Sequence, residues 1–379
     1  MSGVEDALFE DIHTNRCIPF VGAGFSKNAA GKSMPDYVEL AQSLARFVDM
    51  SEDEAASCPE KVYTAYSTKY GSTKLKEEIC RTLEGAKPGE AHRLFVTLGW
   101  THILTTNFDS LLEDALNDAD ILTDICACER DFSAISDSSR GGKPRIAVVK
   151  IHGDCNHRSD MAVDPADLTP QNYERQRPML TSFLKENLGR KSALFIGYSL
   201  RDPNVAFLKK FVEVELHISG GATRNPYIIL IDPTEKEFRD YQKDGFIPVP
   251  LAATEVGVSP GDAVLDFLRK AKTYCVKRCV EEHTSQQKVA SKLAALVVSP
   301  RESADRYAGG PFPIEEVAVG HLPNYCSASD KYRVVLIAPA QDLASWISGI
   351  APHLELFGLE LIAMPQELLS RLIGDEDGE

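Results

Sequence analysis

The feature that most constrains the fold is a series of short, almost unbroken apolar runs, several of them followed by stretches with helical periodicity. We predict strands at residues 17–21, 102–105, 146–151, 193–196 and 227–231. Alternating strands and helices are typical of parallel sheets, and strands covered on both faces are apolar throughout. The pattern therefore predicts an α/β fold with a parallel sheet.

The ends of these predicted strands are polar or glycine-rich. Each is followed by glycine, asparagine, histidine or aspartate. Because ligands of open α/β sheets bind beyond the carboxyl ends of the strands, we expect these strand ends to form one shared site. Helical periodicity at residues 37–48, 61–70, 75–83 and 92–98 predicts a helical insertion, at about residues 35–100, beside that site.

The rest of the chain predicts a second, smaller region. A long amphipathic stretch at residues 264–288 could close a first domain that ends at residue 298. Residues 299–325 are rich in proline and glycine, which predicts a linker. Strand candidates at 333–338 and 359–363, with helix candidates at 343–350 and 365–373, predict a small C-terminal α/β region at 326–379 that could serve assembly or partner binding.

Composition and charge exclude several classes of protein. A hydrophobic fraction of 43% with 26% charged residues is that of a globular chain, and the net charge of −15 disfavours binding to nucleic acid or anionic lipid. No run reaches the roughly 18 apolar residues that span a bilayer, and the acidic start does not resemble a signal peptide. We therefore expect a cytoplasmic protein with no membrane association. Nine cysteines without a CxxC pair argue against a secreted disulfide framework.

The loop after the first predicted strand is rich in small residues, with Gly22, Ala23 and Gly24 preceding Ser26. Small residues let the backbone approach a phosphate closely, and exposed amides can donate hydrogen bonds to it. A tight strand-to-helix turn without a ligand is the alternative. Ser26 stands where a P-loop requires glycine, so residues 31–33 (GKS) do not complete that pattern and we reject an ATPase interpretation.

Two further strand ends carry side chains suited to catalysis. The segment TTNFD at 105–109 places Asn107 where its amide could reach a ligand hydroxyl or a water, whereas Asp109 could equally cap the next helix. The segment KIHGD at 150–154 carries His152. A neutral imidazole with a pKa of about 6.5 suits a general base, although a single histidine of this kind is more often a satisfied core residue.

The last two strand ends carry groups that could bind phosphate or ribose. Gly197 and Ser199 follow the fourth predicted strand, and the serine hydroxyl could meet phosphate oxygens. Asp232 ends the fifth, where a carboxylate could accept hydrogen bonds from a ribose diol. Capping of the following helix is the alternative for Asp232.

With the motifs GAGFS, GKSMPDY, TTNFD, KIHGD and GYS in this order, the chain resembles the sirtuin superfamily over about residues 17–235. The usual forms in that family are GAGxS, GxPDF, TxNxD, HG and GxS. The resemblance implies a Rossmann-like sheet that binds NAD, with the Gly22 loop at the pyrophosphate. It also implies that Asn107 and Asp109 lie near the nicotinamide ribose and that His152 is the catalytic base.

The resemblance implies further contacts to the cofactor. It places Asp36 and Thr106, which lie in the second and third motifs, among the cofactor-binding residues. It places Ser199 and Asp232 at the far half of NAD.

Deacylases of the family carry paired CxxC motifs after the HG segment, and these bind a structural zinc. Here Cys155 is followed by no cysteine until Cys275, and the spacing of Cys126, Cys128, Cys155 and His157 matches no standard zinc site. We therefore expect no structural zinc and no other metal.

Without that module, and with GYSLRDPN in place of GTSL, the chain more closely resembles the zinc-free sirtuin-like NADases of bacterial antiphage defence. Stand-alone members of that group assemble with HerA-type hexameric ATPases. The resemblance therefore implies a homo-oligomer and a HerA-type partner.

We accordingly expect an NAD+ hydrolase that cleaves the bond between nicotinamide and ribose and depletes NAD in antiphage defence. In this hypothesis Asn107 orients water or ribose, His152 accepts a proton, and Asp109 holds the ribose or an amide partner. Two alternatives remain open. One is an NAD-dependent protein deacylase or ADP-ribosyltransferase that uses the same pocket, and the other is a non-catalytic sensor of NAD or ADP-ribose.

Overall fold

The computed structural model describes residues 2–134, 145–163, 175–198, 225–254, 257–286, 295–300, 332–338 and 360–365. The chain divides into two compact units, the first of residues 1–96 and 100–264 and the second of residues 97–99 and 265–379. Within the described ranges, no helix is both long enough and apolar enough to cross a membrane.

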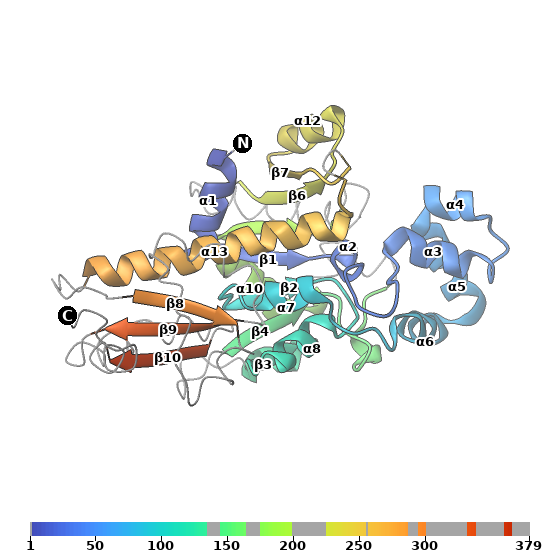
Figure 1. Cartoon of the computed structure of the whole chain (residues 1–379). Coiled ribbons are helices and arrows are strands. Elements are labelled where there is room, and N and C mark those ends of the chain that lie inside the picture. The colour runs from blue at the N-terminus through green and yellow to red at the C-terminus, as the bar shows by residue number, and fades with distance from the viewer. Residues whose placement is uncertain are drawn as a thin grey trace, which may run out of the picture. The chain divides into compact units, whose positions relative to one another are not determined.

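A seven-stranded sheet lies at the centre of the first unit (Figure 1). All of its neighbouring strands are parallel, which confirms the predicted α/β fold. The strands, in the order β3-β4-β2-β1-β5-β6-β7, are β1 (Cys17–Val21), β2 (His102–Thr105), β3 (Leu122–Cys126), β4 (Arg145–Lys150), β5 (Ser192–Ile196), β6 (Tyr227–Ile231) and β7 (Ile247–Leu251).

The five predicted strands are all present, three with the predicted bounds and two shifted by a single residue at one or both ends. The two outermost strands, β3 and β7, were not among the predicted strands. Asp124 interrupts the apolar pattern of β3, whose residues are mostly half-buried or exposed. Pro248 and Pro250 interrupt β7, and proline is tolerated there because an edge strand leaves some of its amides unpaired.

The order of the strands determines where a ligand can bind. From β1 the chain builds β2, β3 and β4 on one side, and then returns to build β5, β6 and β7 on the other. The strand order thus reverses at β1, which has β2 and β5 as its neighbours. Ligands of open α/β sheets bind at such a reversal, outside the carboxyl ends of the strands.

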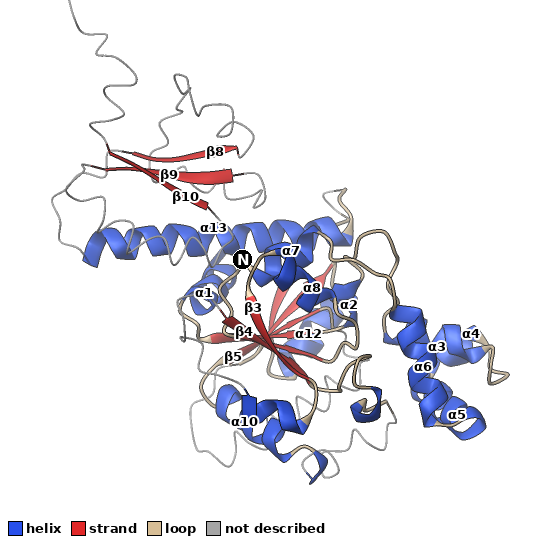
Figure 2. Ribbon diagram, turned by 90° about the horizontal axis from the view of Figure 1, so that it is seen from below, coloured by secondary structure: helices blue, strands red, loops and turns tan. Residues whose placement is uncertain are grey.

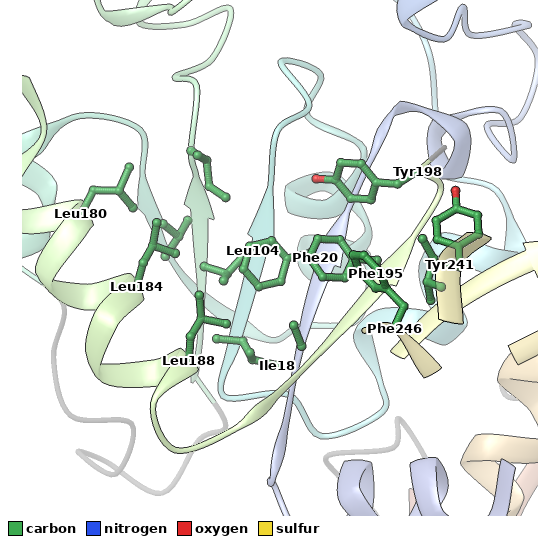
Figure 3. Close-up of a cluster of buried hydrophobic side chains, with 14 of the residues drawn as sticks. Ile18, Phe20, Leu104, Leu180, Leu184, Leu188, Phe195, Tyr198, Tyr241 and Phe246 are labelled. Carbon is green, nitrogen blue, oxygen red and sulfur yellow. The ribbon is translucent and has the colours of Figure 1, made fainter. Parts of the chain in front are cut away.

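Helices cover both faces of the sheet (Figure 2). Helices α7 (Glu90–Val96) and α8 (Leu111–Asp118) lie on one side, and α10 (Pro178–Leu188) lies on the other. Helix α12 (Glu235–Lys243) contributes Tyr241 to the same buried cluster as α10. At the centre of this cluster the rings of Phe20 and Phe195 stack with centroids 4.9 Å apart (Figure 3). Helix α1 (Ser2–His13) precedes β1.

The region predicted as a helical insertion contains α7, which lies on the sheet, and four further helices that share a hydrophobic core of their own. They are α3 (Tyr37–Ala45), α4 (Glu52–Ser57), α5 (Pro59–Tyr70) and α6 (Ser72–Leu83). Figures 1 and 2 show them as a lobe beside the sheet. Buried Met161, from the loop after β4, joins the core of this lobe.

A disulfide between Cys80 of α6 and Cys155 joins the same lobe to the loop after β4. The two cysteines lie 75 positions apart in the sequence, and no sequence pattern predicted that they pair. Cys17, Cys126 and Cys128 are buried and form no disulfide.

The second unit contains a three-stranded sheet with the order β10-β9-β8. Strands β9 (Tyr332–Ala338) and β10 (Glu360–Pro365) correspond to the two predicted strands and pair in parallel. Strand β8 (Ala295–Pro300), which the sequence analysis missed, pairs antiparallel with β9.

Helix α13 (Pro260–Gln286) contains most of the predicted amphipathic stretch. The helices predicted at 343–350 and 365–373, and the predicted linker beyond residue 300, lie outside the described residues. The domain bounds therefore stay a prediction.

Candidate active site

The loops that follow β1 and β5 interlock at the point where the strand order reverses. Gly22 N donates to the carbonyl of Ile196 at 2.9 Å, and Gly24 N donates to that of Gly197 at 2.9 Å. A Cβ atom on Gly22 would lie 2.6 Å from the Gly197 carbonyl oxygen, and one on Gly197, whose φ is +75°, would lie 2.2 Å from Phe25 N. The close contact between the two loops is therefore enough to require these glycines, whether or not a ligand binds. Their approach to a phosphate stays a prediction.

The end of β2 is bound to the ends of β1 and β5. Thr105 Oγ1 donates to the carbonyl of Val21 at 2.8 Å and accepts from Asn107 N at 3.0 Å. The hydroxyls of Thr106 and Tyr198 lie 3.0 Å apart. These bonds hold the three strand ends together and fix the backbone of Asn107.

The side chain of Asn107 belongs to a directed chain of hydrogen bonds. Its Nδ2 donates to the Gly22 carbonyl at 3.0 Å and to Ser26 Oγ at 2.9 Å, and Ser26 Oγ donates to Asp109 Oδ2 at 2.8 Å. Because a carbonyl can only accept, the orientation of the amide is fixed. Asn107 Oδ1 is buried and has no hydrogen-bond partner among the described residues, so it can accept from a ligand.

The Asp109 carboxylate binds both the start of the next helix and the Ser26 hydroxyl, and its expected role near the ribose stays a prediction. Its Oδ2 accepts from Ser26, while its Oδ1 accepts from Leu111 N at 3.1 Å, in the first turn of α8. The capping of α8 and the bond to Ser26 therefore occur together and hold the carboxylate in one position.

His152 lies two positions after Lys150, the last residue of β4, and is only 3% exposed. The loop that carries it turns back sharply: Ala162 N donates to the His152 carbonyl at 2.9 Å. Gly153 has a φ of +80°, and a Cβ there would lie 2.7 Å from the carbonyl oxygen of Asp160. The glycine after the histidine is thus required by the tight fold of this loop.

These side chains line one cavity of about 80 Å³. This volume lies below the range of about 300–1,000 Å³ that is usual for small-molecule sites, so the cavity as it stands would hold only part of a dinucleotide. The predicted site residues on its wall are Ala23, Ser26, Asp36, Thr106, Asn107, Asp109 and His152. The structure therefore brings together residues from the ends of β1, β2 and β4, as the strand-end argument predicted.

The apolar part of the cavity wall comes mainly from the helical lobe. Leu40, Tyr63, Ile79 and Leu83 line it, together with Val163. The sequence analysis named none of them as site residues. Helical periodicity predicted their helices, but it does not reveal which helix face meets a loop that lies far away in the sequence.

Asp36 lies on the cavity wall as the N-cap of α3. Its Oδ1 accepts from Val38 N at 3.0 Å and Glu39 N at 2.9 Å, and its carboxylate pairs with Lys27 at 2.7 Å. Partial burial acts to raise the pKa of Asp36, but the Glu39 amide and the Lys27 ammonium outweigh burial and lower this pKa. Asp36 is therefore an ionised anchor of the lobe beside the cavity.

The GKS segment at residues 31–33 does not act as a phosphate loop in this structure. Lys32 Nζ donates to the backbone carbonyls of Thr82, at 2.7 Å, and Glu84, at 2.6 Å, at the C-terminal end of α6. Cations stabilise helix C-termini, where carbonyls lack partners within the helix. The lysine is thus engaged within the lobe, which agrees with rejection of an ATPase.

Several predicted cofactor residues do not line the cavity. Gly22, Gly24 and Gly197 are not among its lining residues and instead join the loops after β1 and β5. Asp232 has a φ of +45°, and its carboxylate accepts from Ala253 N at 2.8 Å and from Thr254 N and Oγ1 at 3.0 and 2.6 Å. The Thr254 side chain and these amides lower the pKa of Asp232. Ser199 lies outside the described residues.

The described residues contain no group of three or more His, Cys, Asp or Glu side chains arranged to hold a metal ion. Of the set weighed as possible zinc ligands, Cys155 is bonded to Cys80 and does not offer a thiolate.

The chain is similar to several known proteins. Residues 101–247 match the family model of the SIR2-like domain. The chain is 26% identical over 215 residues to the NAD(+) hydrolase ThsA of Acinetobacter baumannii, which covers 55% of this chain and 42% of that protein. It is 23% identical over 236 residues to the NAD(+) hydrolase ThsA of Cytobacillus dafuensis, which covers 62% and 44%.

A third relative, the defense-associated sirtuin 2 of Bacillus subtilis, is 24% identical over 276 residues, or 69% of this chain and 26% of that protein. The chain thus spans less than half the length of each of these relatives. The matched segment begins just before β2 and carries Asn107, Asp109 and His152. The parallel sheet fits the similarity of residues 101–247 to the SIR2-like domain.

Proposed function

We propose that the protein is an NAD+ glycohydrolase that cleaves the bond between nicotinamide and ribose. The observation that carries this proposal is that Asn107 and Asp109, which follow β2, and His152, which follows β4, line the same cavity. The SIR2-like domain and the relatives named NAD(+) hydrolase support NAD as the substrate.

The chemistry places modest demands on the protein. When the bond from ribose C1′ to the nicotinamide nitrogen breaks, its electron pair neutralises the pyridinium, so the leaving group needs no acid. Water then attacks an oxocarbenium-like ribose, and a base accepts the proton. The products are nicotinamide, ADP-ribose and a proton. The protein must therefore position water and stabilise positive charge on the ribose.

The residues on the cavity wall fit these tasks. The carbonyl of Asn107 is fixed as an acceptor and would orient a ribose hydroxyl or the attacking water. Asp109, held by Ser26 and the α8 amide, would supply negative charge near the ribose. His152 would accept the proton, a role that typically contributes about 10² to 10⁴ in rate.

The apolar wall of the helical lobe supports the same assignment. Leu40, Ile79 and Leu83 have hydrocarbon side chains that take no part in catalysis, but they would cover the planar nicotinamide ring. Exclusion of bulk water strengthens the electrostatic interactions within a site.

A cleavage assay with matched variants tests the proposal. Purified protein is incubated with NAD, and nicotinamide is quantified by chromatography for wild type, His152→Ala, Asn107→Ala and His157→Ala. His157 lies on the same loop as His152 but its side chain is 52% exposed, so its variant is the control. We expect at least a 100-fold loss in the first two variants, with folding intact, and turnover near wild type in the control. Turnover near wild type in all three variants would refute the assigned roles.

The same experiment separates the alternative functions. With an acylated peptide present, only a deacylase makes O-acyl-ADP-ribose, and a transferase leaves ADP-ribose on protein. Tight binding of NAD without turnover, even with a candidate ATPase added, would instead indicate a sensor.

We further propose that the activity depletes NAD in antiphage defence, in a homo-oligomer with a HerA-type hexameric ATPase. The name of the Bacillus subtilis relative supports the role in defence. The oligomer and the ATPase rest on the sequence resemblance alone. Light scattering of the purified protein, with and without a HerA-type ATPase, tests both.

A further inference from the structure

One buried cation connects the strand that carries His152 with the loop that carries Asp109. Lys150 is the last residue of β4, two positions before His152, and its side chain is 1% exposed. Its Nζ donates to Glu113 Oε1 at 2.6 Å and to the backbone carbonyl of Asp109. The lysine belongs to the KIHGD motif, but the proposed chemistry does not use its charge.

Stability of the fold does not by itself account for the buried ion pair of Lys150 and Glu113. Burial raises the pKa of Glu113, and the neighbouring Lys150 offsets this only in part. The second carboxylate oxygen, Glu113 Oε2, is buried without a hydrogen-bond partner among the described residues. Desolvation of a buried pair often cancels its attraction, and apolar residues of similar volume then serve the fold equally well.

The contact with Asp109 lies where the regular sheet no longer supports the site. The last paired residues of β2 and β4 are Thr105 and Lys150. Just beyond them, Ile151 N donates to the Thr105 carbonyl at 2.8 Å, and the β2 loop is joined to the β4 side by a bond of 3.3 Å from Cys155 N to the Phe108 carbonyl and by Lys150. The lysine therefore supports the segment from which the Asn107–Ser26–Asp109 chain extends.

We propose that Lys150 is a positioning residue for NAD cleavage. Its ammonium holds the backbone of Asp109, and through Ser26 the Asn107 amide, in register with His152. The charge stays paired with Glu113 and does not contact the substrate. This inference rests on the proposed function, because the groups that it positions are those assigned to NAD cleavage.

The two residues of the ion pair can be separated by mutation. Lys150→Met leaves a buried, unpaired carboxylate and is expected to destabilise the fold. The double variant Lys150→Met with Glu113→Met removes both charges and is expected to regain most of the stability. Glu113→Gln removes the counter-ion but leaves the lysine bound to the Asp109 carbonyl. The double variant and Glu113→Gln thus distinguish positioning from charge pairing.

The first readout is steady-state cleavage of NAD by the purified chain. We expect the double variant to lose about 100-fold in kcat, since misplacement of catalytic groups by about 1 Å has effects of this size. Its KM should stay within a few-fold of wild type, and Glu113→Gln should keep kcat within a few-fold. A double variant with the stability and kcat of wild type would overturn the proposal. If the double variant does not fold, a 100-fold loss of kcat in folded Glu113→Gln would overturn it.

A second readout does not depend on catalysis. Hydrogen exchange of the apo protein is compared between wild type and the double variant, with β6 and β7 as the internal reference. Faster exchange confined to residues 106–110 supports the positioning role, and unchanged exchange there contradicts it. If wild type fails to cleave NAD, the proposed function fails, while the exchange comparison still decides whether Lys150 positions the loop.

Discussion

The interlocked glycines predict that a single methyl group at residue 197 disrupts the site. Gly197 has a φ of +75°, and a Cβ there would lie 2.2 Å from Phe25 N. An ordinary contact of about 3.4 Å requires a shift of roughly 1 Å between the loops after β1 and β5. Alanine in the left-handed region costs about 1–2 kcal/mol, and overpacking typically adds about 1–3 kcal/mol. Gly197→Ala should therefore lower the free energy of unfolding by roughly 2–5 kcal/mol.

The chain offers a matched control for the backbone term. Gly245 has a φ of +82°, but a Cβ there would meet nothing within 4 Å. Gly245→Ala should cost only the left-handed term, about 1–2 kcal/mol, and should leave NAD binding unchanged. Urea unfolding followed by circular dichroism, with NAD affinity from calorimetry, measures both variants. If Gly197→Ala is no less stable than Gly245→Ala and binds NAD normally, the loops do not depend on this close contact.

Three further perturbations follow from the structure. Cys80→Ser or Cys155→Ser removes a disulfide between cysteines 75 positions apart, so the unfolded chain gains conformational entropy and the free energy of unfolding should fall by roughly 2–4 kcal/mol. A reductant should reproduce this loss in wild type and have no such effect on the variants. Ser26→Ala removes the link between Asn107 and Asp109 and should reduce nicotinamide release about 10-fold, corresponding to roughly 1.4 kcal/mol; an unchanged rate would show that the link is dispensable. Burial lowers the pKa of His92 to about 4, so between pH 6.5 and 4 only the unfolded chain takes up this proton. The free energy of unfolding should fall by up to about 3 kcal/mol as the pH drops through this range, and His92→Gln should lose that part of the pH dependence; equal slopes would contradict the assignment.

The sequence predicted the centre of the fold better than its edges. Buried parallel strands are apolar along their whole length, so β1, β2 and β6 were found with their bounds. The edge strands are half-exposed or contain proline, and neither Asp124 in β3 nor Pro248 in β7 suggests a strand. Their assignment depends on pairing with a neighbour, which a local pattern does not contain.

Much of the candidate site also followed from the sequence, because parallel strands place their carboxyl ends at one edge of the sheet. Asn107, Asp109 and His152 indeed line one cavity. The orientation of the Asn107 amide could not be predicted, since it depends on the Gly22 carbonyl, 85 positions away in the chain. The hydrogen bonds from Thr254 to the Asp232 carboxylate could not be predicted either, because Thr254 follows β7 and that strand was not predicted.

The central claim is that the loops after β1, β2 and β4 form one site for NAD. A crystal structure of the His152→Ala variant bound to NAD tests this most directly. We predict that the nicotinamide end lies in the cavity beside Ser26, with a ribose hydroxyl within hydrogen-bond distance of Asn107 Oδ1. NAD bound elsewhere, with no ligand atom near the Asn107 carbonyl, would contradict the account.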